Sequence, residues 1–155
     1  MNTQPGRTNA DTRKKLAFGV LAVLAFATVL YLTFQGPKET TQLSGGFQAW
    51  LFMTFGWDIE MHTLRSNIHF VEYFGVGLTL ALFARSMEWK RWAVWALIAG
   101  CAFGLLDETI KIFLPTREFD GIDFIKDCIG IAAAIGTVYV FNNCLRGGNI
   151  TNRGK

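Results

Sequence analysis

Charged side chains gather in one short stretch of this sequence, residues 105–130, which lies between two strongly apolar segments. The stretch carries Asp107, Glu108, Lys111, Arg117, Asp123, Lys126 and Asp127. Charge within or beside lipid is costly unless the groups pair with one another or serve a function. Side chains of these types could form an ion-pair network, bind an anionic group, or act as acid and base on a bound substrate.

A second set of polar residues precedes this stretch and has helical spacing. His69, Glu72 and Tyr73 stand at positions i, i+3 and i+4, so they would share one face of a helix. Arg65 stands about one turn before them. For His69, packing or pairing with Glu72 is favoured over catalysis, because no serine or cysteine stands beside it at a useful spacing.

Two aspartates of the charged stretch would repel each other. Asp123 and Asp127 are four residues apart and would lie on one face of a helix. A cation between them, or a proton on one of them, would relieve the repulsion. Pro115 ends the preceding helix and turns the chain, so we expect Arg117 to fold back over the cluster. The cations available for this role are Arg65, Lys111 and Arg117.

Composition indicates a single membrane domain. Of the 155 residues 51% are hydrophobic and 17% are charged, against about 25% charged residues in soluble domains. The net charge of +3 forms no basic stripe, because basic residues stand in short clusters beside apolar runs, which argues against a nucleic-acid partner. The three cysteines have neither CxxC spacing nor a histidine neighbour, so we expect no disulfide framework, metal or cofactor. They are Cys101, Cys128 and Cys144.

Four apolar segments are long enough to cross a bilayer, which takes about 20 helical residues. They cover residues 16–34, 68–84, 92–113 and 122–145. Short loops favour antiparallel packing, so we predict an all-α membrane protein with a bundle of four transmembrane helices over residues 16–145, flanked by tails at 1–15 and 146–155. Glycines would permit close helix packing at positions 75, 77, 100, 104, 130 and 136.

The segment between the first and second predicted spans contains an aromatic patch. Residues 47–57 read F-Q-A-W-L-F-M-T-F-G-W, which is too short to span a bilayer but rich in residues that favour its interface. One interpretation is a short interfacial helix or re-entrant segment. The other is a loop that rests on the bilayer.

The positions of Lys and Arg predict the topology. These residues concentrate in the N-terminal tail, in residues 85–91 and in the C-terminal tail, so both termini are predicted to be cytoplasmic. In that orientation the second, third and fourth spans carry their charged residues to one layer in the outer third of the membrane. Asp107, for example, lies about 22 Å along the third span from its cytoplasmic end.

Two segments resemble the VanZ family, small membrane proteins named for teicoplanin resistance. R-S-N-I-H-F-V-E-Y-F-G-V-G, starting at residue 65, resembles R-K-x-A-H-F-x-E-Y-x-x-x-G, and residues 107–130 resemble D-E-x-x-Q-x-F-x-P-G-R followed by D-x-x-x-D/N-x-x-G. The matching positions are Arg65, His69, Phe70, Glu72, Tyr73, Gly77, Asp107, Glu108, Phe113, Pro115, Arg117, Asp123, Asp127 and Gly130. Ser66 replaces a usual Lys, Lys111 a Gln and Thr116 a Gly, so a cation lost at 66 would be regained at 111.

The resemblance implies a multi-pass protein of the bacterial cytoplasmic membrane and no established enzyme activity. We expect it to bind an outer-leaflet anionic lipid, a cell-wall precursor or a lipoglycopeptide, and so to contribute to teicoplanin-type tolerance. The candidate site or polar cluster consists of Arg65, His69, Glu72, Tyr73, Asp107, Glu108, Lys111, Arg117, Asp123 and Asp127.

Two alternatives stay open. The protein could be an intramembrane enzyme acting on a lipid-linked phosphate, with His69 or Asp123 as general base and Arg117 on the phosphate. It could also be a structural or assembly partner whose charges only hold the bundle together.

The predicted orientation can be tested with reporter fusions. We expect green fluorescent protein at the C-terminus to fluoresce and alkaline phosphatase at the same place to be inactive, because the first folds in the cytoplasm and the second outside it. Alkaline phosphatase fused after residue 58, on the predicted outer side, should be active. The opposite pattern would invert the topology.

Overall fold

The described part of the chain is built from helices. The computed structural model describes residues 5–35, 37–114 and 119–151, and no strand occurs within those ranges. The helices are α1 (Pro5–Phe34), α2 (Pro37–Phe55), α3 (Met61–Ser86), α4 (Trp92–Lys111) and α5 (Gly121–Thr151). The predicted all-α fold class is confirmed.

Four helices are long and apolar enough to cross a membrane, as predicted. The segments concerned are Asn9–Phe34, Ser66–Ser86, Trp92–Lys111 and Gly121–Cys144. α1 and α5 extend past the predicted spans because each helix continues into polar sequence. α4 ends slightly before the predicted limit of residue 113. There the N–H groups of Ile112 and Phe113 donate to carbonyls three residues earlier, at 3.2 and 3.0 Å, the tighter geometry typical of a helix end.

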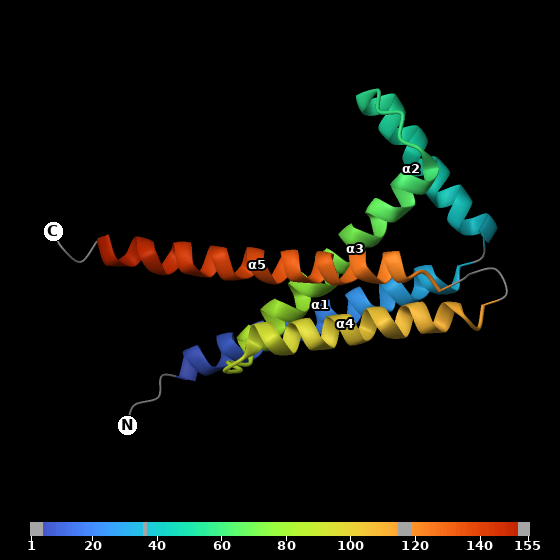
Figure 1. Cartoon of the computed structure of the whole chain (residues 1–155). Coiled ribbons are helices and arrows are strands. Elements are labelled where there is room, and N and C mark those ends of the chain that lie inside the picture. The colour runs from blue at the N-terminus through green and yellow to red at the C-terminus, as the bar shows by residue number, and fades with distance from the viewer. Residues whose placement is uncertain (1–4, 36, 115–118, 152–155) are drawn as a thin grey trace.

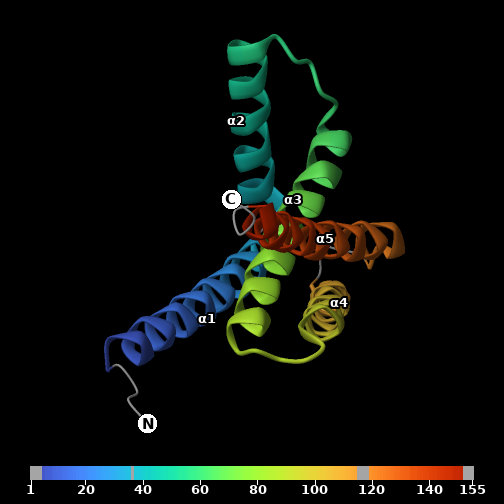
Figure 2. The ribbon, with the colours of Figure 1, turned by 90° about the vertical axis from the view of Figure 1, so that its left-hand side faces the viewer.

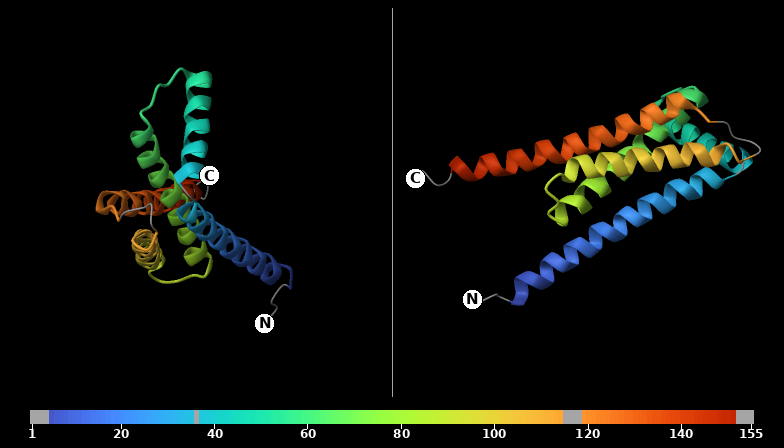
Figure 3. Two further views of the ribbon diagram at one scale, coloured as in Figure 1. Left: turned by 90° about the vertical axis from the view of Figure 1, so that its right-hand side faces the viewer. Right: turned by 60° about the horizontal axis from the view of Figure 1, so that its bottom comes forward.

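α3 is the central element of the bundle. It packs against α5, α1 and α4, while α4 also packs against α5. Figures 2 and 3 show α3 passing obliquely between α1 on one side and α4 and α5 on the other. Consecutive spans run in opposite directions, so both ends of the chain lie at the same end of the bundle (Figure 1).

Buried apolar side chains form one core along α3. They are Val29, Tyr73, Val76, Leu80, Ala81, Ala96, Ile131 and Val138. The outer surface is apolar as well: Leu24, Trp95 and Tyr139 are each more than half exposed. Apolar surface of this extent would be a liability in water but suits helices that face acyl chains.

Glycines bring the backbones of α3 and α5 into contact. A Cβ added to Gly77 of α3 would lie 2.7 Å from the Cα of Ile131. A Cβ added to Gly130 of α5 would lie 2.7 Å from the carbonyl oxygen of Phe70. Neither position has room for a side chain, so the two helices can cross this closely only with glycine at both.

Of the other glycines that were predicted to permit close packing, some contact a neighbouring helix and some do not. Gly100 packs against the side chain of Ile131, and Gly104 lies against Tyr73, so the G-x-x-x-G pair serves packing within the chain. At Gly75 and Gly136 an added Cβ would meet no atom of the described residues within 4 Å. The expectation of close packing at these two positions was wrong, because spacing in the sequence does not say which face of a helix meets a neighbour.

The aromatic patch forms the second half of α2, so the helical interpretation of this segment holds. The helix begins at Pro37, well before the patch, and runs obliquely to the spans (Figures 1 and 2). It ends at Gly56, whose φ of 69° is in the left-handed region and whose N–H donates to the Phe52 carbonyl at 2.9 Å. This is a common way to end a helix, and glycine tolerates it without strain.

Substitution of the glycines can test the close crossing of α3 and α5. We expect Gly77→Ala and Gly130→Ala each to lower the free energy of unfolding by about 1–3 kcal/mol, because the added methyl would overlap backbone atoms. Thermal denaturation in detergent would measure this. Gly136→Ala is the matched control on α5 and should leave stability unchanged or slightly raised, since alanine favours helix. Equal effects at 130 and 136 would contradict the described crossing.

Candidate functional site

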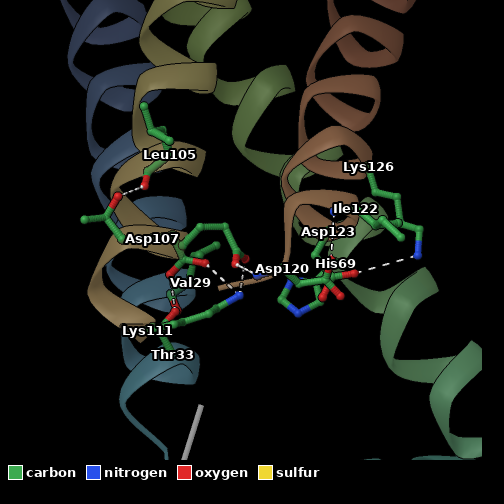
Figure 4. A network of polar contacts seen from close by, with 12 residues as sticks. Val29, Thr33, His69, Leu105, Asp107, Lys111, Asp120, Ile122, Asp123 and Lys126 are labelled. Atoms are coloured by element: carbon green, nitrogen blue, oxygen red, sulfur yellow. Dashed lines mark hydrogen bonds and ion pairs between the residues drawn. The ribbon is translucent and has the colours of Figure 1, made fainter. Parts of the chain in front are cut away.

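Polar side chains from four helices meet at the end of the bundle opposite the chain termini (Figures 1 and 4). We call them the polar layer: Thr33 of α1, Ser66, His69, Glu72 and Tyr73 of α3, Asp107, Glu108 and Lys111 of α4, and Asp123, Lys126 and Asp127 of α5. The structure thus brings the described members of the predicted cluster to one level. Arg117 lies outside the described residues, and Arg65 lies on α3 with a side chain that also falls outside the description.

The last turns of α4 supply a buried ion-pair group. Asp107 and Glu108 are fully buried and Lys111 is nearly so. The Lys111 ammonium donates to Glu108 Oε1 and lies 3.5 Å from Asp107 Oδ2. One cation therefore serves two carboxylates on its own helix, at a C-terminal end where the helix dipole also favours positive charge.

α1 joins this group through Thr33. The Thr33 hydroxyl contacts Asp107 Oδ1 and lies 3.0 Å from the carbonyl oxygen of Val29 on its own helix. Its single hydrogen can serve one of these acceptors at a time. Sequence reasoning missed Thr33, because the first span was considered only for its hydropathy. A buried hydroxyl near the end of an apolar span is the signal that could have found it.

Glu108 also ties α4 to the start of α5. Its Oε2 accepts a hydrogen bond of 3.1 Å from the backbone N–H of Asp120. The Asp120 side chain in turn accepts from the N–H of Ile122 at 2.8 Å, which caps the N-terminus of α5. Asp120 was not among the predicted site residues. Its place just before the helix is a typical capping position.

A second lysine connects α5 to α3. The Lys126 ammonium donates to the hydroxyl of Ser66 and lies 3.7 Å from Asp123 Oδ1. Among the described side chains, Asp123 is thus balanced by a lysine of its own helix, and not by Lys111, one of the cations proposed from the sequence. The charge beside residue 66 also comes from Lys126, whereas Lys111 pairs with the α4 carboxylates.

His69 and Glu72 lie close together on α3, with His69 Nδ1 3.7 Å from Glu72 Oε2. The two side chains are mostly buried. This distance is too long for a good hydrogen bond, and it is an ion pair only if the histidine is protonated. Among the described residues, His69 Nδ1 has no hydrogen-bond partner.

Asp127 is the part of the polar layer that lacks partners. It is fully buried, and within the described ranges neither of its carboxylate oxygens has a hydrogen-bond partner. The same holds for the Tyr73 hydroxyl, which is also fully buried. Both side chains reach α4 at Gly104, where an added Cβ would lie 3.3 Å from Tyr73 Cε1 and 3.6 Å from Asp127 Cβ. Glycine at 104 therefore lets both side chains approach the backbone of α4.

The charges around Asp127 do not cancel. Lys111 attracts it, whereas Glu108, Asp107 and Asp123 repel it. Throughout the described polar layer, carboxylates outnumber lysines, and each lysine is already paired. The described polar layer therefore presents mainly hydrogen-bond acceptors to a ligand. Within the described chain, no group of three or more His, Cys, Asp or Glu side chains is arranged to hold a metal ion.

The two lysines provide a matched test of the ion pairs. We expect Lys111→Met to lower the free energy of unfolding by about 3–5 kcal/mol, because it leaves two buried carboxylates without their cation. Lys126→Met should lower the free energy of unfolding by only about 0–1 kcal/mol, because its partner Asp123 is partly exposed. Thermal denaturation in detergent would measure both. Similar losses of unfolding free energy in the two variants would contradict the conclusion that Lys111 is the cation of the buried ion-pair group.

Comparison with known proteins assigns the chain to a family. No curated protein and no solved structure matches it. A family model described as VanZ/LLP1 matches residues 14–142, which includes every residue of the polar layer. The match is wider than the resemblance seen in the motifs, because it takes in the first span and therefore Thr33. With most of its length matched, the chain belongs to the VanZ/LLP1 family.

Proposed function

We propose that this membrane protein binds the headgroup of an outer-leaflet lipid or lipid-linked cell-wall precursor in the polar layer. The observation that carries the proposal is the fully buried Asp127 carboxylate, which has no hydrogen-bond partner in the described structure. A buried charge of this kind is costly, and in membrane segments such residues commonly mark binding or transport sites.

Helix adhesion alone does not account for this carboxylate. Polar contacts between membrane helices contribute only about 0.6 kcal/mol on average. Asp107 and Glu108 do hold elements together, through Thr33 and the backbone of Asp120. Asp127 makes no such described contact. A bundle selected only for stability would gain by replacing it with a neutral residue of similar size.

The chemistry of the unpartnered groups indicates what the ligand offers. Carboxylate oxygens and an imidazole nitrogen accept hydrogen bonds, so they complement hydroxyl or amino groups. The phosphate of the same headgroup would be bound by Arg65 and Arg117, the cations proposed from the sequence. A phosphate that carries a sugar, glycerol or amine satisfies both requirements. Teicoplanin-type tolerance would follow if binding altered the exposure of such a precursor.

Asp127→Asn is the sharpest test of headgroup binding. It removes the charge while keeping the shape of the side chain, so we expect the bundle to keep its melting temperature. Native mass spectrometry of protein extracted from membranes should show a retained lipid in the wild type and at least a tenfold loss of it in the variant, roughly the value of one charge-assisted hydrogen bond.

Asp11→Asn, at an exposed position near the start of α1 and at the other end of the bundle, is the control and should retain the lipid. Unchanged lipid retention and unchanged teicoplanin susceptibility in Asp127→Asn would overturn the proposal. A lower melting temperature in step with the loss of lipid would instead favour the structural alternative. Turnover of polyprenyl phosphates that disappears in His69→Ala would favour the enzyme.

A further inference from the structure

α2 packs on the protein through a narrow, partly polar face and leaves most of its large apolar side chains exposed. Ser44 and Leu51 are buried and Gln48 is half-buried, at positions i, i+4 and i+7 of one helix face. The Gln48 side-chain amide donates to the Ile59 carbonyl at 2.7 Å, and Gly45 lies against Met61. This face packs on the segment that leads into α3 and on the first turns of α3.

The rest of the α2 surface and the residues that follow the helix carry large exposed apolar side chains. Their exposed fractions run from 44% to 85%, and they are Leu43, Phe47, Trp50, Phe52, Met53, Phe55 and Trp57. Ring contacts link Phe47 to Trp50, Trp50 to Phe55 and Phe55 to Trp57, with centroids 5.7, 5.7 and 5.2 Å apart. We call this surface the aromatic strip. An apolar surface of this extent marks an interaction site.

The position and the ends of α2 favour lipid as the occupant. α2 connects the end of the α1 span to α3 on the side of the bundle that holds the polar layer. Figures 1 and 2 show it projecting sideways from the bundle rather than beyond its end. Gln42 near its start and Asp58 and Glu60 after its end are exposed polar residues. An exposed aromatic second half with polar residues on both sides suits a helix at the membrane interface.

We infer that the aromatic strip is buried in the boundary between headgroups and acyl chains, in the same leaflet as the polar layer. Its ligand is the phospholipid surface. Tryptophan is enriched at this depth because its ring is apolar and its N–H is polar. The charges of Asp58 and Glu60 limit the depth by holding the far end of the helix at the headgroups. A second copy of the chain is the competing occupant.

This placement has a consequence for the polar layer. α2 packs on the first turns of α3, where Leu64 is buried just before Ser66 and His69. A helix fixed at the interface therefore fixes the depth of these α3 residues. The inference does not depend on headgroup binding, since it concerns a different surface.

A variant that keeps Trp50 as its one tryptophan tests the inference. The other four tryptophans are changed to phenylalanine, and the protein is reconstituted in phosphatidylcholine vesicles with bromines at different acyl-chain depths. We expect Trp50 fluorescence to be quenched at least about twofold more by shallow bromines than by deep ones, and little by aqueous iodide. Strong iodide quenching would place the strip in water. No quenching by either would mean that protein covers it. Both results overturn the inference.

Spin labels at a buried and an exposed position of α2 give a second measurement. In a background with Cys101, Cys128 and Cys144 changed to alanine, Ser44→Cys is the inner position and Phe52→Cys the outer one. We expect the label at 52 to collide at least about twice as often with oxygen, which concentrates in lipid, as the label at 44. Equal collision rates, or collisions at 52 mainly with a water-soluble nickel complex, would overturn the inference. Low mobility of the label at 52, in a protein that cross-links as a dimer, would also overturn the inference.

Discussion

The close crossing of α3 and α5 is the constraint on which the polar layer depends. Gly77 and Gly130 let the two backbones touch, and side chains at these positions would separate the helices. Tyr73 and Asp127 lie about one turn from these glycines, and both reach the same point on α4. The geometry of the polar layer therefore originates in a part of the core that carries no charge. Glycine permits this geometry because it has no side chain.

Around this crossing, the polar groups divide into two kinds. Lys111, Thr33 and the backbone of Asp120 contact the carboxylates of α4 and connect α1 and α5 to them. These contacts are structural, because each gives a buried carboxylate a partner within the protein. Asp127 and the Tyr73 hydroxyl are buried at the same level without such contacts in the described ranges. The structural and the binding explanation of the charged cluster therefore apply to different residues.

Much of the fold could be predicted from the sequence, because hydropathy and helical spacing are local properties. The four spans and the common face of His69, Glu72 and Tyr73 followed from them. Contacts between helices did not follow, since they depend on the tilt and rotation of each helix. Thr33, the pairing of Lys126 with Ser66 and the open surroundings of Gly75 and Gly136 belong to this second kind. The exposure of the aromatic side chains of α2 also needed the structure, because composition does not show which side chains face inward.

The contact between Lys126 and Ser66 brings a lysine of α5 to the position where the VanZ motif that this sequence resembles has a lysine on α3. The same positive charge can thus reach one point from either of two helices. A second lysine at 66 would crowd and repel the ammonium of Lys126, so that substitution would be unfavourable while Lys126 is present. The residue tolerated at one of these positions therefore depends on the residue at the other.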